Sequence, residues 1–285
     1  MKKVRTLDLF HGAGGSSTGA QSAGTSIVAG IDLWSIASDC YHRNFPRARA
    51  ISADIRDLSP KELHGQIGDI DLILASPECT NHTCAKGGGD RSEESRLTAF
   101  EVVRFAAEFI PEWIVLENVV HMQSWDAYPK LIEDFEKLGY QIRVEKLNAM
   151  DFGVPQSRRR LFLICSLSGM PDEIVLPDRE VVTAGSVIDL NGGYSFSPLY
   201  SPRRAVPTIE RARRAMTELG EETHFLIVYY GTDQSGGWQS VDRPLRTITT
   251  LDRFAYVRPS PDGHMMRMLQ PEELKLAMGF PSFGG

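Results

Sequence analysis

The stretch VRTLDLFHGAGGSSTG, residues 4–19, joins an aliphatic run to a cluster of glycines. Residues 4–10 have the composition of a buried strand, and the residues after the glycines have that of a helix. A glycine turn between a strand and a helix lets backbone N–H groups approach a ligand closely. The dinucleotide fingerprint G-x-G-x-x-G would need glycine where Ser17 stands, which disfavours a nucleotide-dependent oxidoreductase. The stretch therefore predicts the first strand, turn and helix of an α/β fold.

The same alternation continues along the chain to about residue 170. Further strands are predicted at 26–32, 48–53, 69–75, 112–117, 140–148 and 159–166, and helices at 33–45, 59–67, 92–110 and 126–139. Such alternation implies an α/β fold with a mostly parallel, doubly wound, Rossmann-like sheet. Prolines and glycines then interrupt the pattern. We predict one domain over residues 1–185 and a second, smaller, irregular domain over 186–285.

Composition limits the class of protein. The chain has 285 residues, of which 42% are hydrophobic, and it is long enough for such a fold. It contains no apolar run of the roughly 18–20 residues that span a membrane, and no signal-peptide pattern. The four cysteines are too scattered for a disulfide framework, and Cys79 with Cys84 lacks the second ligand pair of a zinc site. We predict a cytosolic protein with reduced thiols, no metal and no membrane partner.

The charge pattern bears on binding to nucleic acid. A net charge of −6 argues against a protein that coats nucleic acid nonspecifically. The segment SPRRAVPTIERARRA, residues 201–215, nevertheless concentrates arginines and contains one acid, Glu210. These arginines fit a basic face that meets phosphates, and they fit equally well the solvated side of a short helix.

Acidic residues follow two neighbouring predicted strands. Asp32 ends the strand at 26–32, and Asp54 follows the strand at 48–53. Asp32 is placed to accept hydrogen bonds from a ribose, and Asp54 to accept one from an adenine amino group. Each acid alone is explained equally well as a cap on the following helix. Together, the two acids fit an adenosyl ligand.

Six segments resemble, in order, the motifs of the cytosine-C5 DNA methyltransferases, which use S-adenosyl-L-methionine. They are LDLFHGAGGSSTGAQSAG (7–24), the Pro-Cys segment SPECTNHT (76–83), LENVV (116–120), FGVPQSRRRLFLI (152–164), and RPLRTITT (243–250) with RMLQPEELKLAMGFP (267–281). The last two resemble segments that border the family's target-recognition region. Because the resemblance spans nearly the whole chain, it implies a catalytic, donor-binding first domain and a target-recognition second domain.

The reaction explains which side chains the resemblance assigns. Cytosine C5 is too weak a nucleophile to attack a methyl sulfonium until a thiolate adds at C6, and the resemblance gives this role to Cys79. Glu117, next to Asn118, would protonate or hydrogen-bond N3, helped by a pKa that burial raises. Arg160 would hold the cytosine O2, and Arg158 would support the loop. The donor-binding residues implied are Phe10, Gly12, Ala13, Gly14, Gly15, Asp32, Leu33, Asp54 and Ile55.

The partner that the resemblance implies is double-stranded DNA, and the protein is expected to be a monomer in a prokaryotic cytosol or nucleoid. A base inside a duplex cannot present C6 to a thiol, so the target cytosine must be flipped out. Gly87 to Gly89 would give the segment after Cys79 freedom to close over DNA. The residues expected to meet phosphates are Lys86, Arg91, Arg203, Arg204, Arg211 and Arg214.

The sequence departs from the family pattern in places. Glu78 stands where a second proline is usual, and Thr80 where a glutamine is usual. His11 replaces a small residue and is expected to protrude near the methionine end of the donor. The sequence ends at GFPSFGG, before the family's Gly-Asn motif, so we expect a truncated chain or a donor pocket closed in another way. Two alternatives stay open: an RNA (tRNA) cytosine-C5 methyltransferase, and a DNA-binding homologue without catalysis.

Overall fold

The computed structural model describes residues 3–78, 97–190, 193–230 and 236–280. The chain forms two compact units, one of residues 1–147 and 159–175 and the other of residues 148–158 and 176–285. The predicted domain boundary is 185/186, whereas the second unit contains all residues after Val175. The second unit also contains the earlier segment 148–158, which we call the excursion, because the chain enters this unit there and then returns to the first unit.

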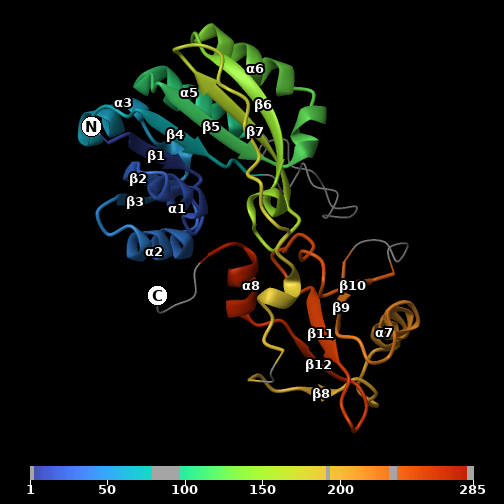
Figure 1. Cartoon of the computed structure of the whole chain (residues 1–285). Coiled ribbons are helices and arrows are strands. Elements are labelled where there is room, and N and C mark those ends of the chain that lie inside the picture. Colours follow the sequence, from blue (N-terminus) through green and yellow to red (C-terminus); the bar gives the residue numbers. More distant parts are fainter. Residues whose placement is uncertain (1–2, 79–96, 191–192, 231–235, 281–285) are drawn as a thin grey trace. The chain divides into compact units, whose positions relative to one another are not determined.

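The first unit is built on a seven-stranded sheet with the order β3-β2-β1-β4-β5-β7-β6 (Figure 1). Its strands are β1 (Arg5–Leu9), β2 (Ser26–Asp32), β3 (Arg49–Ser52), β4 (Leu72–Ala75), β5 (Trp113–Asn118), β6 (Gln141–Asn148) and β7 (Arg159–Ser166). Strands β1 to β5 pair in parallel, and β7 pairs antiparallel with β5. This arrangement confirms the predicted α/β, mostly parallel, Rossmann-like sheet.

Helices cover both faces of this sheet. They are α1 (Gly15–Ser22), α2 (Ser35–Asn44), α3 (Pro60–Ile67), α5 (Ala99–Phe109) and α6 (Tyr128–Lys137). Side chains alternate between the two faces of a strand, and β1 shows this clearly. Leu7 and Leu9 belong to the main core with Phe105 of α5, whereas the Asp8 carboxylate accepts a hydrogen bond from Ser17 of α1. The glycine turn follows the carboxyl end of β1 and leads into α1.

The second unit contains a five-stranded sheet that the sequence did not predict. Its order is β10-β9-β11-β12-β8, and its strands are β8 (Ser197–Pro198), β9 (Phe225–Val228), β10 (Trp238–Ser240), β11 (Phe254–Arg258) and β12 (Met265–Met268). All of the paired strands are antiparallel. Helices α7 (Val206–Leu219) and α8 (Pro271–Ala277) complete the unit. Residues from the two faces of β9 and β11 belong to two separate hydrophobic clusters.

The excursion at 148–158 is fixed to the second unit by Gln156. This side chain is 1% exposed; its Nε2 donates to the carbonyl of Ala277 at 3.3 Å, and its Oε1 accepts from the N–H of Ile248 at 3.1 Å. The backbone of Gln156 also forms a parallel bridge with Leu245. The family-like segment FGVPQSRRRLFLI is therefore divided, with Gln156 in one unit and Arg160 in the other.

Candidate active site

The glycine turn after β1 is held in a backbone conformation that favours glycine. Gly12 and Gly14 have φ angles of +52° and +93°, in the left-handed region that side chains disfavour. A Cβ atom on Gly14 would lie 2.5 Å from the ring of Phe45. Phe10 also has a positive φ, +64°, which costs on the order of 1–3 kcal/mol in a residue other than glycine. Phe10 is half-buried against the main core, and its predicted contact with adenine stays a prediction.

The Asp32 carboxylate ties the turn to the end of β2. The N–H of Gly12 donates to Oδ2 and the N–H of Trp34 donates to Oδ1, both at 2.8 Å. Each carboxylate oxygen accepts more than one hydrogen bond, so Asp32 keeps capacity for a ligand hydroxyl. Leu33, predicted to contact the donor, is 70% exposed beside it.

Asp54 follows β3 and caps the 3₁₀ helix Ile55–Asp57. It accepts from the Arg56 N–H at 3.0 Å and forms a two-pronged ion pair with the guanidinium, at 3.0 Å and 2.6 Å. Hydrogen bonds from Arg56 lower the pKa of this carboxyl to about 2. Asp54 is therefore an ionised acceptor at neutral pH. Ile55 is buried in the main core.

Glu117 and Arg160 come together at the ends of neighbouring strands. In the antiparallel register of β5 and β7, Glu117 lies opposite Phe162, and Arg160 is two residues from Phe162 along β7. The guanidinium Nε lies 2.8 Å from the Glu117 carboxylate, and the two side chains are 15% and 24% exposed. The structure therefore places a carboxylate and a guanidinium side by side, both partly open to solvent.

Asn118 links this pair to the segment that leads to Cys79. Its Nδ2 donates to the carbonyl of Pro77 at 3.1 Å, and its Oδ1 accepts from the N–H of Val119 at 2.8 Å. Asn118 is 2% exposed, so both ends of a buried amide are satisfied. Pro77 lies two residues before Cys79 in the sequence, and Cys79 itself lies outside the described residues, as do Lys86 and Arg91.

Arg158 is separated from Arg160 by the division between the units. Its backbone belongs to the second unit, where its N–H donates to Asn148 Oδ1 at 2.8 Å. The supporting role predicted for its side chain stays a prediction.

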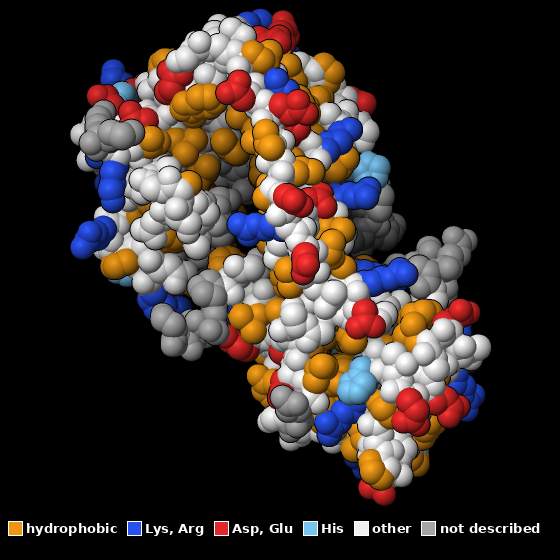
Figure 2. Space-filling model, in the orientation of Figure 1, with side chains coloured by type: hydrophobic (Ala, Val, Ile, Leu, Met, Phe, Trp, Pro, Cys, Tyr) orange, Lys and Arg blue, Asp and Glu red, His pale blue; other side chains and the backbone are white. Residues whose placement is uncertain are grey.

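The arginines around α7 lie on the second unit, and several of them contact that unit itself. Arg204 donates to Ser197 at 2.8 Å, the Arg211 guanidinium lies 5.8 Å from the Tyr229 ring centroid, and Arg214 donates to the carbonyl of Gly236 at 3.2 Å. Arg203 is exposed. On the face of the molecule that Figure 2 shows, basic and acidic side chains are interspersed. Phosphate binding by these arginines stays a prediction.

Sequence reasoning missed a buried polar cluster beneath the glycine turn. Ser17 donates to Asp8 at 2.6 Å and shares a hydrogen bond of 2.8 Å with the Tyr41 hydroxyl. Burial raises the pKa of Asp8 to about 7. The ring of His11 stacks on Tyr41 and is 4% exposed, so the expectation that His11 protrudes is wrong. The sequence offered one signal for this cluster: Asp8 lies between two leucines in TLDLF, where a buried strand is predicted.

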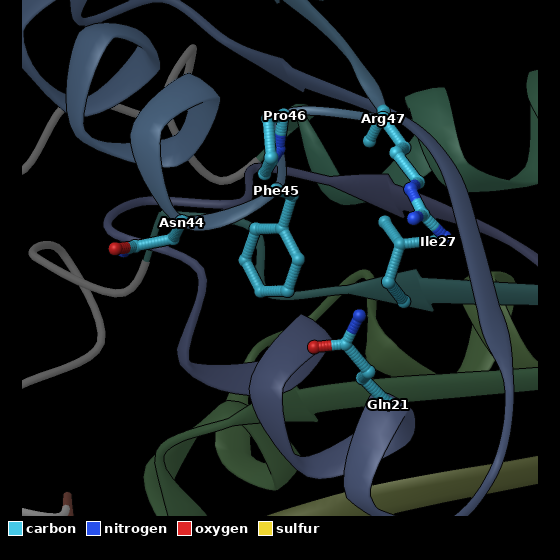
Figure 3. A pocket seen from close by; sticks show the side chains of 7 residues that line it. Gln21, Ile27, Asn44, Phe45, Pro46 and Arg47 are labelled. Atoms are coloured by element: carbon cyan, nitrogen blue, oxygen red, sulfur yellow. The ribbon is translucent and has the colours of Figure 1, made fainter. Parts of the chain in front are cut away.

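A pocket of about 230 Å³ opens beside α1 and the end of α2 (Figure 3). Gln21 of α1 faces the ring of Phe45 across it, and Ile27 lines it from β2. None of its lining residues is a residue predicted to bind the donor. The chemistry predicted from the sequence therefore does not lie in this pocket.

Two further properties bear on the class of protein. Among the described residues, no helix combines the length and apolar composition needed to cross a membrane. In the same part of the chain, no three His, Cys, Asp or Glu side chains are grouped so that they could hold a metal ion.

Comparison with known proteins identifies the family. The type II methyltransferase M.DdeI of Desulfomicrobium norvegicum is 36% identical over 189 residues, covering 63% of this chain and 45% of the relative. The human tRNA (cytosine(38)-C(5))-methyltransferase is 28% identical, covering 60% of this chain and 44% of the relative. The chain spans about half the length of such curated relatives.

A solved structure shows the same fold at low sequence identity. The crystal structure of the S. pombe Dnmt2 methyltransferase matches with a TM-score of 0.63 and 19% identity, over 98% of this chain and 87% of that one. The family model for C-5 cytosine-specific DNA methylases matches residues 4–283. The chain therefore belongs to the C-5 cytosine-specific DNA methylase family.

Proposed function

We propose that the chain catalyses methyl transfer from S-adenosyl-L-methionine to C5 of cytosine in double-stranded DNA. The observation that carries this proposal is the arrangement at the carboxyl ends of β4 and β5. There the Glu117 carboxylate meets the Arg160 guanidinium at 2.8 Å, and Asn118 holds the backbone that leads to Cys79. A carboxylate, a guanidinium and a thiol are the three groups that addition to a cytosine ring requires.

The residues act on the base as follows. The Cys79 thiolate adds to C6 and forms an S–C6 bond, and the electron pair of the C5–C6 double bond moves towards C5 and N3. Glu117 holds a proton at N3, while Arg160 donates to the O2 atom, so the developing charge is stabilised. After C5 has accepted the methyl group, its proton passes to water acting as a base. The electron pair of the C5–H bond then re-forms the C5–C6 double bond, and the S–C6 bond breaks to restore the thiolate.

The first unit has groups that fit the donor. S-adenosyl-L-methionine would supply an electrophilic methyl group when bound. Among the described residues, no atom lies within 4 Å of the place that a Cβ atom on Gly12 would take, so this side of the turn is open to a ligand with respect to them. Asp32 would accept from the ribose hydroxyls and Asp54, with its low pKa, from the adenine amino group. Phe10 and Leu33 would contact the adenine, and Gly12 to Gly15 would lie along the donor.

DNA is the favoured substrate because the family model is that of DNA methylases and M.DdeI is a type II methyltransferase. The second unit would read the target, and the arginines around α7 would meet phosphates. The relative that acts on tRNA supports RNA as the second candidate substrate. In either case the thiol reaches C6 only if the cytosine leaves its stack.

A covalent trap tests the proposal without knowledge of the target sequence. We would prepare duplex DNA and an RNA transcript in which every cytosine is 5-fluorocytosine. Fluorine takes the place of the C5 hydrogen and cannot be removed by a base, so the S–C6 bond stays in place. With donor present, wild-type protein and Cys84→Ser should form a denaturation-resistant complex with DNA, and Cys79→Ser should not. A complex that depends on Cys84 would contradict the assignment, and trapping on RNA alone would make RNA the substrate.

A further inference from the structure

His11 is a buried side chain at a position where the family resemblance implies a small residue. Its ring centroid lies 4.0 Å from that of Tyr41, with 28° between the planes. A Cβ atom on Gly30 would lie 2.8 Å from His11 Cδ2, so the glycine in β2 makes room for the ring. His11 is therefore built into the layer between β2 and α2.

One ring nitrogen of His11 holds the glycine turn. Nδ1 lies 2.7 Å from the carbonyl oxygen of Gly12; because a carbonyl only accepts, Nδ1 carries the proton and donates. The other nitrogen, Nε2, lies 3.5 Å from the Ser38 hydroxyl. Burial lowers the pKa of His11, which agrees with a neutral ring that has a single proton.

Gly12 is consequently held at both of its peptide groups. Its N–H donates to Asp32 at 2.8 Å, and its carbonyl accepts from His11. Without these two bonds a glycine samples many backbone conformations. With them, it stays at a φ of +52°, and the open side of the turn keeps one shape.

We propose that His11 is a positioning residue that holds Gly12 in the conformation that binds the methyl donor. This inference rests on the proposed function, because it takes S-adenosyl-L-methionine as the ligand of the turn. His11 does not touch the donor; it acts through the Gly12 carbonyl. Fixing a loop in its bound conformation before the ligand arrives increases affinity by reducing the ordering that binding requires.

Isosteric substitutions separate the two ring nitrogens. In His11→Asn the amide nitrogen lies as many bonds from Cα as Nδ1 does, so the bond to Gly12 is kept. In His11→Gln the amide nitrogen takes the place of Nε2, and in His11→Ala both contacts are lost. Titration calorimetry with S-adenosyl-L-methionine should show affinity within about threefold of wild type for Asn, and about tenfold weaker binding for Gln and Ala. Ser38→Ala, which removes only the contact to Nε2, should bind as wild type does.

Hydrogen exchange gives a readout that does not depend on the donor. Amides of residues 10–15 should exchange faster in His11→Gln than in His11→Asn, while amides of β4 and β5 exchange equally in both variants. The inference is overturned if Gln binds the donor as tightly as Asn, or if the turn exchanges equally in the two. Wild-type protein that binds no donor would contradict the proposed function instead, and the exchange comparison would still decide whether His11 holds the turn.

Discussion

The carboxyl group of Asp8 makes the stability of the first unit depend on pH near neutrality. The residue is fully buried in β1, and burial raises its pKa from 3.8 to about 7, against hydrogen bonds from Ser17 that lower it. The unfolded chain releases this proton at a lower pH than the folded chain does. The protonated Asp8 carboxyl therefore stabilises the folded state fully below about pH 4, and this contribution to the free energy of unfolding is lost as the pH rises through about 7. These two pKa values make the free energy of unfolding fall by about 1.4 kcal/mol between pH 6 and pH 8.

Replacing Asp8 with Asn removes this titration and keeps an acceptor for Ser17. Urea unfolding, followed by tryptophan fluorescence at pH 6, 7 and 8, should show a smaller fall in Asp8→Asn than in wild type. The difference between the two proteins should change by about 1.4 kcal/mol over this range. His64, whose pKa is raised by Glu108 and Asp69, contributes equally to both proteins and cancels. Parallel pH profiles for the two proteins would refute the argument.

Two further substitutions test the packing and the active site. Gly30→Ala should lower the free energy of unfolding by about 1–3 kcal/mol, because the new Cβ would lie 2.7 Å from Tyr41 Cζ and 2.8 Å from His11. Gly19→Ala, where no atom of the described residues lies within 4 Å of the new Cβ, is the matched control and should not destabilise the protein. Asn118→Ala removes the hydrogen bond to the Pro77 carbonyl. It should slow single-turnover methylation by about tenfold or more and leave the affinity for the donor unchanged. If the rate and the donor affinity fall equally, Asn118 acts on the fold as a whole.

The sequence predicted the first unit well because its signals are local. Most of the strands from 26–32 to 159–166 are short β-branched or aliphatic runs, with glycines, prolines or acids close to their ends. The second sheet was missed for a physical reason. Strand β9, FLIV, is buried on both faces, so it shows no alternation, and its partners β10 and β11 are set by pairing across loops.

The candidate site residues were assigned from the family resemblance, and the sequence did not predict their surroundings. The Glu117–Arg160 pair depends on the antiparallel register of β5 and β7, which no motif spacing reveals. The orientation of His11 depends on a space that Gly30 leaves in a neighbouring strand. The hydrogen bond between Tyr41 of α2 and Ser17 of α1 likewise depends on packing between segments that are separate in the sequence.

The excursion of residues 148–158 determines how this protein can be recombined. A chimera joined once near residue 185 would leave Gln156 from one parent to bond with Ile248 and Ala277 from the other. A complete exchange of the second unit needs three junctions, at 147/148, 158/159 and 175/176. In evolutionary terms, the segment with Gln156 must change together with the unit to which it is bonded, although in the sequence it lies inside the segment FGVPQSRRRLFLI, which resembles a single family motif.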